Sequence, residues 1–138
     1  IGLFKESNVD FVSNRLNKTF PAGLEVQVFR KKSLERVAQS TTDPAFREHG
    51  TSYIYTHPKE FTMKNFTSNS YNAPNKRWLL DYPEDYQFIK AIYDRLYPNN
   101  PFFTPQDVLA LLEKEPELEK INSEYPVDLK EIEHYEVL

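Results

Sequence analysis

Asp81 is the residue whose type and position most suggest chemistry. A mostly apolar run, Arg77-Trp78-Leu79-Leu80, precedes it, and Pro83 follows where a helix should begin. A carboxylate at such a junction can bind a divalent cation, because Mg²⁺ usually takes one or two carboxylates together with phosphate oxygens. The same position also suits a helix cap, in which Asp81 and Glu84 form a capping box. The residues alone leave a metal ligand and a helix cap as alternatives.

A cation, an acid and a potential base follow one another at Arg47-Glu48-His49. Adjacent residues of a helix do not face each other, so these three cannot all line one pocket equally. The alternative is a partly exposed helix with a local ion pair. His57 and His134 do not add metal-ligand spacing to His49, so a zinc site is not expected.

Glu25 is a third candidate and lies on the polar side of a predicted strand. Apolar and polar residues alternate through residues 24–29, with period two, which is typical of a strand with unlike faces. Gly23 comes just before this strand. Glu25 is either part of a binding site or a solvent-facing strand residue.

The elements that must position these side chains follow from periodicity and from turn residues. Asp43-Pro44 is a good helix start, with Asp as the N-cap and Pro in the first turn. Strands are predicted at residues 10–14, 24–29, 61–67 and 77–81. Helices are predicted at residues 33–39, 44–56, 83–96 and 104–114, with a further turn or two at 115–121. This order indicates an α/β or α+β domain.

Composition limits the class of protein. The chain has 138 residues, which is about one domain, and no Cys, which excludes disulfides and thiolate zinc sites. No apolar run approaches the roughly 20 residues of a membrane span, and no signal peptide is visible, so we expect a cytoplasmic protein without a membrane partner. Its three glycines form no phosphate-binding loop. Because the first residue is Ile1, we expect a piece of a longer chain.

Charge is distributed unevenly along the chain. Residues 1–99 carry 14 Lys and Arg against 11 Asp and Glu, whereas residues 100–138 carry 3 against 10. A nearly neutral body with an acidic end is a poor binder of nucleic acid, so no nucleic-acid partner is expected. The sequence divides into a body, residues 1–124, and an acidic tail, residues 125–138, that should be loosely held after Asn122.

Four segments, taken in order, resemble a known family. They are Asp10–Asn14, Phe20–Phe29, Phe46–Thr51 and Arg77–Asp85. Together they are similar to the C-terminal half of the cytidylyltransferases that include spore coat polysaccharide biosynthesis proteins of the F type, relatives of acylneuraminate and KDO cytidylyltransferases. The resemblance covers roughly residues 1–124.

The resemblance implies a fold, an activity and a set of site residues. The fold is the C-terminal part of a Rossmann-like α/β sheet with flanking helices, and the activity is transfer of CMP from CTP to a sugar for surface polysaccharide or glycan. Asp81 matches the second of two aspartates that hold Mg²⁺. The resemblance also places Arg47, Glu48 and His49 on the sugar side of the cleft. It places Gly23 and Glu25 in an element that relatives use for sugar contacts and dimer formation.

The same resemblance implies that part of the enzyme lies outside this sequence. The family's phosphate-binding loop and its first metal aspartate would both precede Ile1. We therefore expect the full-length protein to be a homodimeric transferase and this chain alone to be inactive. Two alternatives stay open: a non-catalytic sugar-binding or dimerisation module, and a glycosyltransferase that uses an aspartate-held metal.

Overall fold

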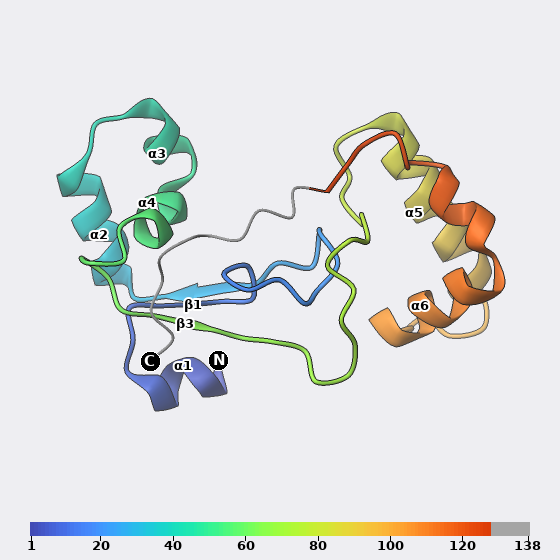
Figure 1. The fold of residues 1–138 in the computed structure, drawn as a ribbon, viewed down its shortest axis with the longest axis horizontal. Coiled ribbons are helices and arrows are strands. Elements are labelled where there is room, and N and C mark those ends of the chain that lie inside the picture. Colours follow the sequence, from blue (N-terminus) through green and yellow to red (C-terminus); the bar gives the residue numbers. More distant parts are fainter. Residues whose placement is uncertain (128–138) are drawn as a thin grey trace. The chain divides into compact units, whose positions relative to one another are not determined.

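The computed structural model describes residues 1–127 and divides into two compact units, each with a core of its own. The first unit contains residues 1–19 and 25–68, and the second contains residues 20–24 and 69–127. In Figure 1 the first unit runs from blue to green, and the second contains a short blue stretch, residues 20–24, and the chain from yellow-green to red. Each unit is described by itself.

A three-stranded sheet organises the first unit. Its strands are β1 (Phe11–Ser13), β2 (Gln27–Phe29) and β3 (Met63–Asn65), in the order β2-β1-β3. The central strand β1 pairs antiparallel with β2 and parallel with β3, and all three of its residues are buried. Mixed α/β architecture is thereby confirmed, with helices flanking a small sheet.

The strand predicted at residues 24–29 is shorter than expected. Only Gln27–Phe29 pairs with β1, and Val26 is exposed. The reason lies elsewhere in the chain, because the side-chain oxygen of Asn14 accepts the Val26 N–H at 2.7 Å. A side chain thus takes the place of a ladder partner where the strand would have begun.

Four helices complete the first unit. They are α1 (Gly2–Ser7), α2 (Lys31–Ser40), α3 (Pro44–Glu48) and α4 (Gly50–Thr56). The predicted cap at Asp43 is confirmed, since its carboxylate accepts the Ala45 N–H at 2.9 Å. The single helix expected from residue 44 is wrong, because His49 leaves helical geometry and Gly50, a poor helix former, starts a new helix.

Apolar side chains from the sheet and from α2 and α4 form the core of the first unit. Buried residues of this core are Phe11, Leu16, Val37, Tyr53, Ile54, Phe61 and Met63. Phe29, Phe46 and Tyr55 pack against it from partly exposed positions.

Helices dominate the second unit. They are α5 (Pro83–Leu96), α6 (Pro105–Lys114) and the short 3-10 helix η1 (Pro116–Lys120), all close to their predicted positions. Buried core residues are Phe88, Ile92, Val108, Leu111, Leu112 and Leu118. None of the helices among the described residues 1–127 is long and apolar enough to cross a membrane.

The strand predicted at residues 77–81 is wrong. Instead of a strand, Arg77 forms a single parallel bridge with Ala22. Two hydrogen bonds make this bridge: the Trp78 N–H donates to Ala22 O at 2.8 Å, and the Ala22 N–H donates to Lys76 O at 2.9 Å. Leu80 is 64% exposed and therefore does not belong to a buried strand. The segment is an extended connection that leads into α5.

The start of α5 also differs from the prediction. The N-cap is Tyr82 rather than Asp81, and the carboxylate that caps the first turn is Asp85 rather than Glu84. Asp85 accepts the Tyr82 N–H at 3.2 Å and the Asp81 N–H at 3.1 Å. The capping box is thus displaced by one residue, which leaves the Asp81 side chain outside it.

The chain after Asn122 is held further than expected. The ring of Tyr125 stacks on Tyr82 with centroids 4.0 Å apart, and its hydroxyl donates to the Glu84 carboxylate at 3.2 Å. Of the predicted tail, residues 128–138, including His134, lie outside the described residues.

Candidate functional site

A buried ion pair fixes the backbone at Asp81. The Arg77 guanidinium donates to both Asp85 oxygens, from Nε at 2.9 Å and from Nη2 at 2.7 Å. The Asp85 side chain is 0% exposed and that of Arg77 is 10% exposed. Asn122 Nδ2 donates to Asp85 at 2.9 Å and to Arg77 O at 3.2 Å. Both oxygens of the buried carboxylate therefore accept hydrogen bonds, as a buried charge requires.

Asp85 stays charged under physiological conditions. The hydrogen bonds from Arg77 hold its pKa well below its usual range and outweigh burial, which alone would raise the pKa. Asn122 and the backbone N–H groups of Asp81 and Tyr82 lower the pKa further. A carboxylate held in this way cannot exchange protons near neutral pH, so Asp85 acts as an anchor rather than as an acid or base.

Two aromatic rings add to this anchor. The guanidinium carbon of Arg77 lies 5.5 Å from the ring centre of Tyr82 and 5.7 Å from that of Tyr125. Each ring is thus within the range in which a cation is attracted to its π face. Residues far apart in the sequence, from the connection before α5 and from the segment after η1, meet on one guanidinium.

Asp81 is presented at the edge of this cluster. Its side chain is 60% exposed, and its Oδ2 accepts one long hydrogen bond from Arg77 Nη2, at 3.3 Å. Its backbone N–H is tied to Asp85. The result is an accessible carboxylate on a fixed turn.

Asp81 can supply one oxygen ligand to a metal ion. An exposed carboxylate fits Mg²⁺, which takes few protein ligands and completes its shell with water and phosphate. Within residues 1–127 there is no group of three or more His, Asp or Glu side chains that could hold a metal. Asp81 is accessible as a single carboxylate ligand, and Arg77 would have to release it or share it with a bound metal ion.

A groove in the first unit brings two predicted residues together. It has a volume of about 540 Å³ and lies between β2, α2 and α4. Glu48 and His49 both line it, with His49 Nε2 and Glu48 Oε1 4.0 Å apart. The other lining residues are Arg15, Gln27, Phe29, Leu34, Gly50, Thr51, Ser52 and Tyr55.

Arg15 is a groove residue that the sequence did not indicate. Its guanidinium carbon lies 5.8 Å from the centre of the Tyr55 ring, within the range of a cation–π contact. Together with His49 it gives the groove a basic side, while Glu48 gives it an acid. Such a mixture can bind a polar ligand by both donors and acceptors.

The remaining sugar-side candidates lie elsewhere. Arg47 does not line the groove, because its Nη2 donates to Ala38 O at 3.0 Å, at the end of α2. Glu25 is exposed just before β2, and Gly23 belongs to the second unit with Asp81. The structure thus groups Glu48 with His49 and leaves Arg47 and Glu25 outside their groove.

Sequence reasoning missed the anchor around Asp81. Asp85 and Asn122 carry no motif of their own, and a buried Arg–Asp pair eight residues apart has no periodic signal. The available hint was that Asp85 is the third helical residue after Tyr82, a position from which a carboxylate caps a helix.

Comparison with known proteins identifies two that are similar to this chain. The chain is 28% identical over 97 residues to the spore coat polysaccharide biosynthesis protein SpsF of Bacillus subtilis (strain 168), which covers 70% of this chain and 37% of SpsF. It superposes with a TM-score of 0.75 on a cytidylyltransferase from Leptospira borgpetersenii serovar Hardjo-bovis (strain JB197). The resemblance to the cytidylyltransferases is confirmed.

The extent of these matches matters for function. The match to the Leptospira enzyme is 22% identical and covers 84% of this chain and 48% of that enzyme, so it establishes the fold. The chain thus spans less than half the length of either relative. No protein-family profile matches the chain.

Proposed function

We propose that the chain is part of a nucleotidyltransferase that transfers CMP from CTP to a sugar, for a surface polysaccharide or glycan. The observation that carries this proposal is Asp81, an accessible carboxylate on a turn that a buried ion pair holds fixed, within a cytidylyltransferase fold. Similarity to SpsF supports a role in polysaccharide biosynthesis.

The proposed reaction is a phosphoryl substitution. A sugar hydroxyl oxygen attacks the α-phosphorus of CTP, a new oxygen–phosphorus bond forms, and the bond to the β-phosphate oxygen breaks. Pyrophosphate leaves with that electron pair, and the hydroxyl proton passes to a base or to water. Mg²⁺, when bound, neutralises phosphate charge and so favours attack by the hydroxyl.

The residues of this chain take three roles in the proposal. Asp81 contributes one carboxylate to the Mg²⁺ site. Glu48 and His49 bind sugar hydroxyls from the groove of the first unit. Of the other residues that the resemblance placed on the sugar or dimer side, Glu25 and Arg47 belong to the same unit as the groove but lie outside it, and Gly23 supports the connection that leads to Asp81.

Two further properties belong to the same proposal. The whole protein forms a homodimer, and its sheet gives one reason, since β2 and β3 are edge strands of the described sheet and edge strands favour pairing with another chain. A reaction that consumes CTP would take place where nucleotides are made, so we place the protein in the cytoplasm.

Pyrophosphate release from the whole gene product tests the proposal. CTP, UTP, ATP and GTP are each supplied with Mg²⁺ and a panel of sugars, and the nucleotide sugar is identified by mass spectrometry. We expect release with CTP and at least one sugar, and none from the 138-residue chain alone, because it spans only 37% of SpsF. A CMP-sugar product made by the isolated chain would contradict the proposed division of the site, and no product from the whole protein with any pair would contradict the function.

A further inference from the structure

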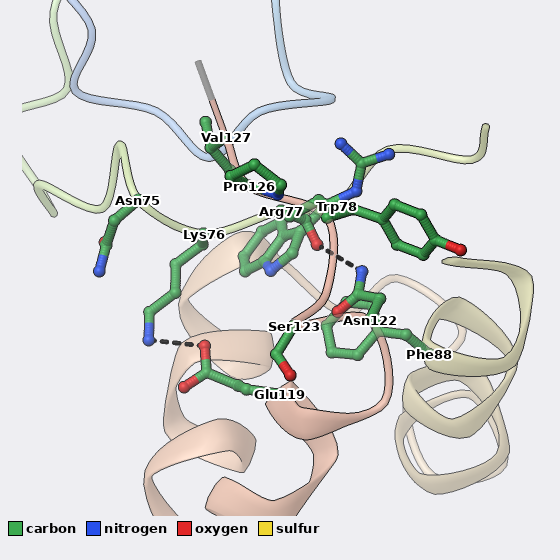
Figure 2. A pocket seen from close by; sticks show the side chains of 11 residues that line it. Asn75, Lys76, Arg77, Trp78, Phe88, Glu119, Asn122, Ser123, Pro126 and Val127 are labelled. Carbon is green, nitrogen blue, oxygen red and sulfur yellow. Dashed lines mark hydrogen bonds and ion pairs between the residues drawn. The ribbon is translucent and has the colours of Figure 1, made fainter. Parts of the chain in front are cut away.

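A second pocket, in the second unit, has an indole for one wall. Its volume is about 270 Å³, and it lies between the connection that precedes α5 and the chain that follows η1. Figure 2 shows Ser123 and the ion pair of Lys76 and Glu119 below Trp78 in this pocket. The nucleotidyltransferase proposal assigns no role to this pocket.

The Trp78 N–H is the first sign that the pocket takes a ligand. Trp78 Nε1 is buried and has no hydrogen-bond partner within the described residues. In Figure 2 the indole nitrogen is on the ring edge turned toward Ser123 and the Lys76–Glu119 pair. A buried donor that lost water without gaining a partner destabilises the fold, and an acceptor oxygen in the pocket would remove that cost.

Charge decides which class of acceptor fits. The Lys76 ammonium is neutralised by Glu119 at 2.6 Å, and the Arg77 guanidinium is neutralised by Asp85 at 2.7 Å. Neither cation of the lining is left without an acid, so the pocket has no net positive field to favour a carboxylate or a phosphate. A neutral ligand with hydroxyl or carbonyl oxygens fits better.

The rest of the lining favours a polyhydroxylated ring. Asn75 supplies an amide, and Ser123, whose hydroxyl donates to Lys120 O at 3.1 Å, keeps its oxygen as an acceptor. The indole supplies a flat apolar wall that also carries a polar edge. A pocket slightly smaller than those of drug-sized ligands suits a single ring rather than an extended chain.

We infer that this pocket binds one neutral saccharide ring, whose oxygen accepts the Trp78 N–H while its apolar face lies against the indole. The ring hydroxyls are bound by Asn75 and Ser123. This site is independent of Glu48 and His49, which the proposed function uses for the sugar that receives CMP.

The single tryptophan of the chain makes the inference directly testable. Because Trp78 is the only Trp, ¹⁵N labelling gives one indole N–H resonance. The 138-residue chain is titrated with methyl glucoside, methyl galactoside and N-acetylglucosamine, and separately with glycerol, acetate and inorganic phosphate. We expect a saturable shift of the indole resonance with at least one saccharide and not with the other three probes.

Variants of the lining separate recognition from folding. Asn75→Ala and Ser123→Ala should each weaken the saccharide about tenfold, the effect of one lost hydrogen bond. Ser40→Ala, at the end of α2, should bind like the parent chain. A shift with acetate or phosphate alone would assign an anion site, an equal shift with glycerol would show no ring recognition, and a resonance that no probe moves would show a closed pocket; each of these results overturns the inference.

Discussion

Asp85 is the residue on which the start of α5 depends. Its carboxylate is wholly buried and forms an ion pair with Arg77. It also accepts hydrogen bonds from the Asn122 side-chain amide and from two backbone N–H groups. Burying this charge is tolerable only because all of these donors converge on it. The buried Asp85 also fixes the position of the exposed Asp81, because it accepts the Asp81 backbone N–H.

Removing that carboxylate should therefore be costly. Asp85→Ala leaves the largely buried Arg77 guanidinium with only its long hydrogen bond to the exposed Asp81, and we expect the free energy of unfolding to fall by about 3–5 kcal/mol. Urea unfolding followed by Trp78 fluorescence measures the change in the second unit. Asp94→Ala is the matched control, because Asp94 is 58% exposed in an ion pair with Lys90 and should change stability by less than about 1 kcal/mol. Equal effects of the two variants would show that the buried pair is not an anchor.

The same carboxylate predicts a dependence of stability on pH. The pKa of Asp85 is lowered in the folded chain, chiefly by the hydrogen bonds from Arg77, so between the folded and unfolded values the unfolded chain binds more protons. Its contribution is complete above the unfolded pKa of about 4 and is lost as pH falls below that value toward the folded pKa. Asp85→Asn should flatten this acid limb of the stability curve. An acid limb as steep in Asp85→Asn as in the parent chain would refute the assignment.

At the scale of elements, Gly23 lies where the segment of residues 20–24 meets the connection that precedes α5. It has φ of +107°, and a Cβ at this position would lie 2.3 Å from Trp78 O, beside the bridge between Ala22 and Arg77. Both the backbone angle and the space thus require glycine. The resemblance placed Gly23 near the sugar, and the structure gives it a supporting role for the connection that leads to Asp81.

Substitution of this glycine should act through structure. Gly23→Ala must displace the Trp78 backbone, and we expect a loss of about 1–3 kcal/mol in the free energy of unfolding. Gly2→Ala is the control, because a Cβ there would meet only Glu6 Oε1 at 4.0 Å within α1, where Ala is the better helix former. It should leave stability unchanged or raise it by less than about 1 kcal/mol. A Gly23→Ala chain as stable as the Gly2→Ala chain would show that the close approach to Trp78 is not required.

Local patterns predicted the elements whose causes are local. Asp43 with Pro44 marked the start of α3, and the apolar spacing of Phe88, Ile92 and their neighbours marked α5. The failures have longer-range causes. Nothing near Val26 in the sequence shows that Asn14 will accept its N–H, and nothing near Leu80 shows that this run faces solvent. Asp81 was singled out because it belongs to a motif, whereas Asn122, which binds the buried Asp85 beneath it, lies 41 positions further along the chain than Asp81.

At the scale of the whole molecule, the residues of the proposed site belong to two units, each compact by itself. Glu48 and His49 line a groove in the unit built on the sheet, and Asp81 stands at the start of α5 in the helical unit. The chain also spans less than half of SpsF and of the Leptospira cytidylyltransferase. Catalysis by the proposed mechanism therefore belongs to the whole protein, and this chain supplies one metal ligand and the sugar-side groove.

The most direct test of the central claim is the Mg²⁺ dependence of CMP-sugar formation by the whole protein with Asp81→Asn and with Asp94→Asn. Both substitutions replace an exposed carboxylate at or within α5 by its amide. We predict that Asp81→Asn lowers kcat/KM about 100-fold or more and raises the Mg²⁺ concentration for half-maximal rate, because a metal ligand is lost. Asp94→Asn should behave like the parent. Full activity with an unchanged Mg²⁺ requirement in Asp81→Asn would contradict the account.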